Sequence, residues 1–173
     1  KEPPDKPALT LALLEKVVKW AREANPSQPL TIGVWTDDWS DPERLTPLNR
    51  FMLENSDVIS FHFYGPLPEL QKRVEPLERY NRPVLCTEYM CRPAGSTFES
   101  ILPWFKERRI GAYNWGLVAG KTQTNYPWET WEKPYESEPE LWFHDIFRPD
   151  GTPFDAAETD LIRRLTGKET PQP

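Results

Sequence analysis

The stretch that decides the fold is PVLCTE at residues 83–88, a short apolar run that ends in a carboxylate. Three similar runs stand elsewhere in the chain: LTIGVW at 30–35, VISFHF at 58–63 and IGAYNW at 110–115. All four are six residues long and have the β-branched and aromatic content that is typical of strands. Their first residues lie 28, 25 and 27 positions apart. The sequence therefore predicts four strands at a nearly constant interval.

Helix-compatible segments lie before, between and after these runs. Apolar residues recur at helical spacing over residues 8–24, and Asn25-Pro26 ends that pattern. Further helices are expected over residues 45–54, 68–80, 97–108 and 155–165. Pro76 and Pro103 weaken two of them, because proline has no backbone N–H to donate. Such alternation of strand and helix predicts parallel strands joined by crossover helices.

Two architectures share this alternation, a doubly wound sheet and a (β/α)₈ barrel. The barrel averages about 31 residues per strand and helix, which is close to the interval seen here. No glycine-rich phosphate loop follows any of the four runs, which weakens the nucleotide-binding doubly wound alternative. We therefore predict an α/β fold that is half of a TIM barrel, helix first, with four parallel strands. It would form one domain over residues 1–173, with a long loop at about 116–140.

The composition limits the kinds of partner. A formal net charge of −6 argues against nucleic acid and against an anionic membrane surface. No apolar run approaches the ~20 residues that cross a bilayer. The polar, proline-rich start KEPPDKP indicates a chain cut or processed within a loop. The compartment stays open on these grounds, and a secreted or periplasmic protein is compatible with them.

Polar and aromatic side chains gather at the carboxyl ends of the four runs, where α/β folds of this kind bind ligands. The candidates are Trp35, His62, Tyr64, Glu88, Asn114 and Trp115. A carboxylate beside a phenol and an imidazole can act as a nucleophile or general base, and tryptophan can stack on a sugar ring. The plainer alternative is that Glu88 caps a surface strand and pairs with an arginine such as Arg92, while His62 is a satisfied buried histidine.

The long loop carries the stretch WETW at residues 128–131. Trp128 would line a sugar subsite, or it would only pack the loop, and the sequence leaves both interpretations open.

A metal site has weaker support. Asp37, Asp38 and Asp41 would offer carboxylate ligands, but acidic residues ahead of a helix more often serve its N-terminus. We therefore expect no metal and no other cofactor.

Cysteine chemistry is a further alternative. Cys86 and Cys91 do not have the paired spacing of a zinc site and are expected to be free thiols. A Cys–His nucleophile pair of either cysteine with His62 or His144 would require a proximity that the sequence does not show.

The order of the motifs FHFYG, VLCTEY and YNWGL resembles the retaining β-glycosidases of glycoside hydrolase clan A, particularly the cellulase-like family 5 and the family 2 catalytic barrel. The likeness covers nearly the whole chain. In that clan, strand seven ends in the nucleophilic Glu, strand six offers a His and a Tyr, and strand eight offers a Trp. The resemblance implies that Glu88 is the nucleophile, that Tyr64 donates a hydrogen bond to it, and that His62 and Trp115 hold and stack the sugar.

The resemblance also implies that the acid/base residue is not part of this sequence and is supplied by another part of the enzyme. The four strands would correspond to strands five to eight, and the clan's acid/base Glu, in an Asn-Glu pair that ends strand four, would precede Lys1. No Asn-Glu or Asp-Glu pair occurs in the chain. A half barrel also leaves strand edges and an apolar face exposed. We expect a companion that covers them: an N-terminal half-barrel chain, a second copy of this chain, or residues missing from the sequence.

Two other functions stay open at this stage. One is a non-catalytic carbohydrate-binding or assembly module that has the strand-end aromatic residues and lacks the acid/base group. The other is a cysteine-dependent hydrolase. The sequence does not fix which sugar is bound, which linkage is cut, or whether the action is exo or endo.

Overall fold

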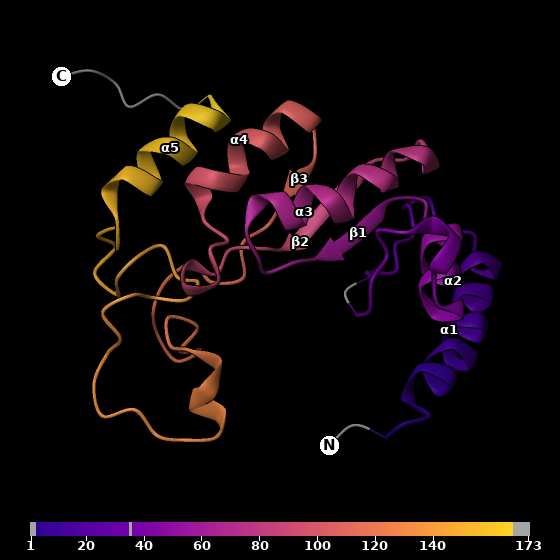
Figure 1. Ribbon diagram of the computed structural model, residues 1–173, viewed down its shortest axis with the longest axis horizontal. Coiled ribbons are helices and arrows are strands. Elements are labelled where there is room, and N and C mark those ends of the chain that lie inside the picture. Colours follow the sequence, from indigo (N-terminus) through magenta and orange to yellow (C-terminus); the bar gives the residue numbers. More distant parts are fainter. Residues whose placement is uncertain (1–2, 35, 168–173) are drawn as a thin grey trace. The chain divides into compact units, whose positions relative to one another are not determined.

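The computed structural model describes residues 3–34 and 36–167 (Figure 1). Over these residues the chain is an α/β fold that begins with a helix and contains a three-stranded, open, parallel sheet. The strands are β1 (Ile59–His62), β2 (Val84–Glu88) and β3 (Gly111–Ala112), in this order across the sheet. The α-helices are α1 (Lys6–Glu23), α2 (Pro47–Asn55), α3 (Leu67–Val74), α4 (Phe98–Arg108) and α5 (Ala156–Thr166).

The described chain divides into two compact units. The first holds the described residues up to His62 together with Gln71–Leu85, and it therefore carries α1, α2 and β1. The second holds Phe63–Leu70 together with the described residues from Cys86 onward, and it carries α4, β3, the long loop and α5.

The described part of the run at 30–35, residues 30–34, forms no strand, so the prediction of four strands is wrong in number for the described chain. The run contributes one isolated parallel bridge, between Val34 and Phe61. Before this bridge, the amide of Ile32 donates to the side-chain oxygen of Ser56 at 3.0 Å. Because a side chain takes the hydrogen bond that a neighbouring strand would accept, the ladder does not extend beyond the bridge.

The helices follow the predicted ends closely where a capping residue is present. Thr97 precedes α4, and its hydroxyl accepts a hydrogen bond from the amide of Ser100 at 3.2 Å. Asp155 caps α5 by accepting from the amide of Ala157 at 2.8 Å. Gly167 ends α5 at a φ of 72°, a left-handed conformation that glycine adopts without steric cost.

The two internal prolines act differently. Pro103 lies within α4 without ending it. Pro76 stands where α3 has already given way to a 3₁₀ helix, Glu75–Tyr80, so the single helix expected over 68–80 is split in two. A proline that cannot donate removes one helical hydrogen bond, and the tighter 3₁₀ form accommodates the loss.

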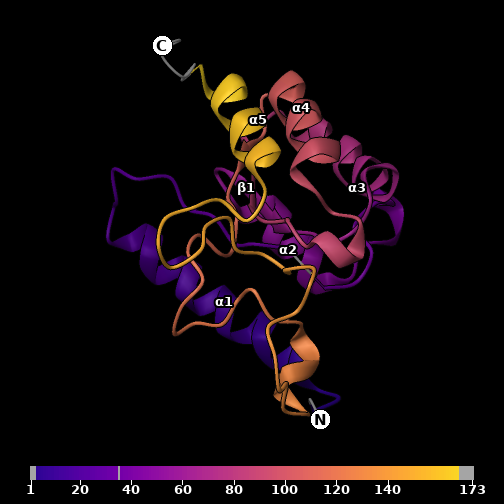
Figure 2. The same cartoon turned by 90° about the vertical axis from the view of Figure 1, so that its left-hand side faces the viewer.

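The core of the second unit is largely aromatic and lies under α4. Tyr89, which directly follows β2, meets the rings of Phe98 and Phe105 edge-on at centroid distances of 6.0 and 5.4 Å. Helices α4 and α5 lie side by side in both views (Figures 1 and 2). This packing fixes the carboxyl end of β2, where the predicted nucleophile stands.

Helix α1 has no buried residue, although it packs beside α2. Its apolar side chains Leu9, Leu13, Val17 and Trp20 are between 41% and 61% exposed. The guanidinium of Arg22 donates to both carboxylate oxygens of Asp57, at 2.6 and 2.8 Å. A polar contact thus anchors the carboxyl end of α1, while its apolar row faces solvent.

We expect Asp57→Ala to loosen α1, because the substitution removes the bidentate ion pair with Arg22 and the acceptor of the Leu30 amide (2.8 Å). Hydrogen-exchange mass spectrometry should show faster exchange over residues 6–23. The hydrogen bond from Arg22 lowers the pKa of Asp57 to about 2. The stabilisation is therefore complete above about pH 4 and is lost as the pH falls through about 2.

Asp160→Ala is the matched control, since it removes an exposed pair with Arg163 (3.1 Å) inside α5. This variant should leave exchange in α1 unchanged. Equal exchange in α1 of the Asp57→Ala variant and of the unmodified chain would show that Arg22 does not anchor the helix.

Candidate functional site

The predicted catalytic pair is in contact in the structure. Glu88 ends β2, and Tyr64 lies in the segment that follows β1. The Tyr64 hydroxyl donates to Oε2 of Glu88 at 2.7 Å. The amide of Phe63 donates to the carbonyl oxygen of Glu88 at 3.0 Å, which aligns the two segments. Burial, and then the hydrogen bond to Glu88, raise the pKa of Tyr64, so the phenol remains a protonated donor.

The long loop folds back onto this pair. The ring of Trp128 meets that of Tyr64 nearly edge-on, at 5.2 Å and 76°. His144 lies 5.4 Å from the Tyr64 ring and 5.8 Å from that of Trp128, measured between centroids. Trp128 therefore forms part of the surroundings of the Tyr64–Glu88 pair.

A cavity of about 630 Å³ opens inside the loop next to these rings. Its wall includes Trp115, Tyr126, Trp128, Trp131, Thr124 and His144. Trp115 is 56% exposed and Trp131 is 85% exposed, so large ring faces are open to a ligand. Flat aromatic faces combined with hydroxyl and imidazole groups suit a ligand with an apolar ring face and polar edges.

His144 is a candidate site residue that sequence reasoning missed, since the sequence suggests it only as a partner of a cysteine. It is 1% exposed, and its Nδ1 lies 2.5 Å from the carbonyl oxygen of Met90. Within the described part of the chain, its Nε2 is buried without a hydrogen-bond partner. Burial lowers the pKa of His144. The one signal in the sequence is a histidine set within the otherwise largely apolar stretch LWFHDIF at 141–147.

The side chain of Asn114 donates hydrogen bonds to two backbone carbonyl oxygens of the chain after β3. Its Nδ2 donates to the carbonyl oxygen of His144 at 3.0 Å and also to that of Gly116. These contacts tie the segment after β3 to the segment that carries His144. The structure thus gives the Asn114 amide group a positioning contact within the protein.

Asp145 contacts two residues of the cavity wall, Thr124 and Gly116. It is fully buried and accepts from the Thr124 hydroxyl at 2.9 and 3.1 Å. Burial raises the pKa of Asp145, because a low-dielectric environment disfavours the charged form. The carboxylate fills the space beside Gly116, where there is no room for a Cβ atom.

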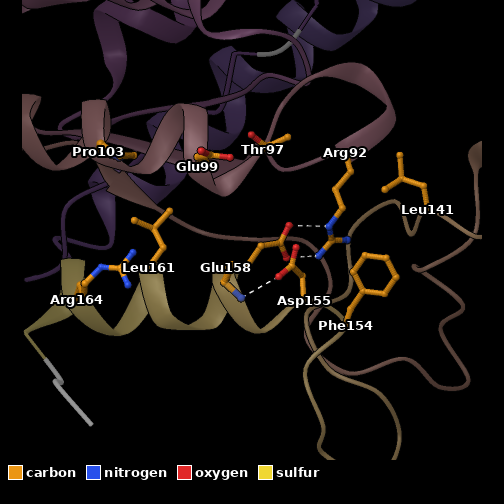
Figure 3. A pocket seen from close by; sticks show the side chains of 11 residues that line it. Arg92, Thr97, Glu99, Pro103, Leu141, Phe154, Asp155, Glu158, Leu161 and Arg164 are labelled. Atoms are coloured by element: carbon orange, nitrogen blue, oxygen red, sulfur yellow. Dashed lines mark hydrogen bonds and ion pairs between the residues drawn. The ribbon is translucent and has the colours of Figure 1, made fainter.

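Arg92 pairs with Glu158, at 2.8 Å through Nε and 2.6 Å through Nη2 (Figure 3). It also donates to the carbonyl oxygens of Trp142 and Asp145, at 3.1 and 3.0 Å. A second cavity, of about 650 Å³, lies beside this pair against α4 and α5. The donors of Arg92 are engaged by protein groups, so we assign the pair a structural role.

Trp35 lies outside the described residues. His62 ends β1 and belongs to the first unit, so the cluster of the second unit is defined without it.

The structure also bears on the two alternatives considered above, a cysteine nucleophile and a metal site formed by aspartates. Cys86 and Cys91 are free and buried, as predicted, and burial raises the pKa of the Cys86 thiol, which disfavours a nucleophilic thiolate. Asp41 accepts a hydrogen bond from the amide of Glu43 at 3.0 Å at the start of a 3₁₀ turn. This contact is the N-terminal role expected of an acidic residue ahead of a helix.

The fold and these contacts define an α/β protein with a carboxylate–phenol pair at a strand end, beside a tryptophan-lined cavity. No protein-family model matches the chain, and no curated protein matches it in sequence. Among the described residues, no helix has the length and apolar character needed to cross a membrane.

The cavity wall makes a test at glycine possible. A Cβ atom at Gly116 would stand 2.7 Å from Oδ1 of Asp145 and 3.0 Å from the Thr124 hydroxyl. We expect Gly116→Ala to lower the free energy of unfolding by about 1–3 kcal/mol, the usual cost of overpacking. Gly120→Ala in the same loop is the control, because its nearest neighbour would be the Val118 carbonyl oxygen at 3.8 Å. Thermal unfolding should separate the two variants, and equal melting temperatures would contradict the packing described here.

Proposed function

We propose that this chain is the nucleophile-bearing half of a retaining glycoside hydrolase that cleaves β-glycosidic bonds in an oligosaccharide or polysaccharide. The finer fold belongs to the same proposal: the three-stranded sheet would be part of a half TIM barrel of the clan A type. One observation carries the proposal, the 2.7 Å hydrogen bond from Tyr64 to Glu88 at the carboxyl end of β2, beside a cavity walled by tryptophans.

The chemistry assigns a role to each member of the pair. A carboxylate oxygen of Glu88 attacks the anomeric carbon and forms a glycosyl ester while the glycosidic C–O bond breaks. A second carboxyl group protonates the leaving oxygen, and water then hydrolyses the ester. The hydrogen bond from Tyr64 holds the Glu88 carboxylate in one orientation. Because the pKa of Tyr64 is raised, the phenol keeps its proton throughout the working pH range.

The proposal requires a companion that carries the second carboxyl group, which retaining enzymes place ~5–5.5 Å from the nucleophile. The exposed apolar row on α1 supports this requirement, because an amphipathic helix ordinarily buries such a row. The companion would be an N-terminal half barrel, either on a separate polypeptide or preceding this chain in a longer one, or a second copy of this chain.

The nucleophile can be tested in the complete enzyme with a 2-deoxy-2-fluoro glycoside, which traps the covalent intermediate. We expect a mass increase on a peptide containing Glu88 and loss of turnover by a factor of at least ~10³ in Glu88→Gln, because the amide does not attack the anomeric carbon. Glu107→Gln changes an exposed carboxylate on α4 and should keep full activity. An adduct on a different residue, or turnover retained in Glu88→Gln, would refute the assignment.

The companion can be tested by the native mass of the purified protein. We expect a complex larger than this chain alone, held together in part by the apolar row of α1. Where the companion is a separate polypeptide or a second copy of this chain, Leu13→Asp should dissociate it, since a charge in an apolar interface is not solvated. Glu15→Gln, at an exposed position of the same helix, should not. A native mass equal to that of one copy of this chain would show that no companion is bound and would contradict this part of the proposal.

A second function has its own support. Trp115 and Trp131 expose large ring faces, at 56% and 85%, and such a surface binds sugars without any catalysis. A non-catalytic carbohydrate-binding module would lose oligosaccharide binding in Trp115→Ala and would form no adduct on Glu88. Trapping with the fluoro-sugar therefore separates the two functions.

A further inference from the structure

We propose that Nε2 of His144 accepts a hydrogen bond from a hydroxyl group of the ligand in the tryptophan-lined cavity, and so selects a hydroxyl group over an anionic oxygen at this position. The inference rests on the proposed function in one respect, that the ligand is a carbohydrate.

The tautomer of His144 follows from its contact with Met90. A carbonyl oxygen can only accept a hydrogen bond, so Nδ1, at 2.5 Å from it, must carry the proton. In the neutral imidazole the other nitrogen, Nε2, is then an unprotonated acceptor. Burial favours this neutral form, as it lowers the pKa of the ring.

The lack of a partner for Nε2 among the described protein groups favours a ligand as its partner. His144 is only 1% exposed, yet it lines the cavity. A buried polar atom without a partner costs about 1–3 kcal/mol, and core histidines normally pair both nitrogens. Among the described residues no group bonds Nε2, so a ligand entering the cavity supplies the missing partner.

The chemistry of the partner follows from the same geometry. An acceptor nitrogen requires a donor, and a sugar hydroxyl donates, whereas a carboxylate or phosphate oxygen does not. The charged groups that act on His144 are Asp145, Glu88 and Arg92, and two of these three are carboxylates. An anionic oxygen placed at Nε2 would face an acceptor to which it cannot donate, and it would lie near the carboxyl groups of Asp145 and Glu88, which disfavour a negative charge. A neutral ring can stack on Trp128 and donate a hydrogen bond to Nε2.

Imidazole nitrogen resonances test the tautomer directly in the ¹⁵N-labelled protein with whatever companion co-purifies. The chain has two histidines, so a His62→Gln variant assigns both. We expect the His144 proton on Nδ1. We also expect the Nε2 resonance to move upfield when cellotriose, xylotriose or β-1,4-mannotriose is added. A proton on Nε2, or no movement with any of the three sugars, would overturn the proposal.

Two substitutions separate the hydrogen bond from the fold. The amide nitrogen of asparagine can take the place of Nδ1 and keep the bond to Met90, so His144→Asn should retain the melting temperature and bind the responding trisaccharide about tenfold more weakly, the loss of one hydrogen bond. His144→Gln places a carboxamide near the position of Nε2 and should bind more tightly than His144→Asn. Equal affinity of His144→Asn and the unmodified protein would contradict the contact.

The outcomes distinguish this inference from the proposed function. If Glu88 is trapped by the fluoro-sugar but Nε2 does not respond, the hydrolase stands and the role of His144 is wrong. If Nε2 responds and Glu88 forms no adduct, the binding role of His144 stands and the hydrolase is wrong. Acetate, an anion without a hydroxyl group, should leave Nε2 unmoved at the same concentration, and a response equal to that of the sugars would contradict the selection against anionic oxygens.

Discussion

The second unit depends on a buried guanidinium. Arg92 is 8% exposed and donates to Glu158 and to the carbonyl oxygens of Trp142 and Asp145. Breaking a buried pair of this kind typically costs about 3–5 kcal/mol, because the remaining charge is left without compensation. The same side chain therefore joins the segment after β2, the end of the long loop and the first turn of α5. In the sequence, His144 lies between Trp142 and Asp145, whose carbonyl oxygens accept from Arg92. These two hydrogen bonds hold the backbone on both sides of His144 and so hold its ring beside Tyr64.

This arrangement explains how a long loop can hold a defined site. Loops with few internal contacts are mobile, but here Asn114 binds the carbonyl of His144 and Thr124 binds the carboxylate of Asp145. Gly116 and Thr124, which line the cavity, are thereby bound to Asn114 and Asp145. A wall held by such contacts, together with exposed tryptophan faces, is the combination that a preorganised binding site requires.

The helix-first α/β order was predicted from local periodicity, whereas the hydrogen bond between Tyr64 and Glu88, which the structure contains, was an expectation from the resemblance to the glycosidase clan. Reasoning from local periodicity failed at residues 30–35, where an apolar run looks like a strand but Ser56 takes the hydrogen bond of Ile32. That competition involves a residue 24 positions away, and no local pattern contains it. The role of His144 escapes sequence reasoning for a similar cause. Its significance comes from the carbonyl of Met90, 54 positions earlier in the chain, and from an Nε2 that no group of residues 3–34 and 36–167 bonds, which only the folded chain reveals.

Two surfaces of this chain have side chains that would be stabilised by a further partner: the apolar row of α1 and the tryptophan-lined cavity. The chemistry of each surface indicates whether that partner is a protein or a small ligand. The row on α1 is made of Leu9, Leu13, Val17 and Trp20, and burial of an apolar row is favoured by another apolar surface. The cavity of the long loop pairs tryptophan faces with the buried Nε2 of His144, which no described residue bonds. An apolar protein surface would leave that nitrogen unsatisfied, at a cost comparable to a lost hydrogen bond. A ligand with both an apolar face and donating hydroxyls satisfies the two requirements together, so the cavity favours a sugar while the helix favours a second protein surface.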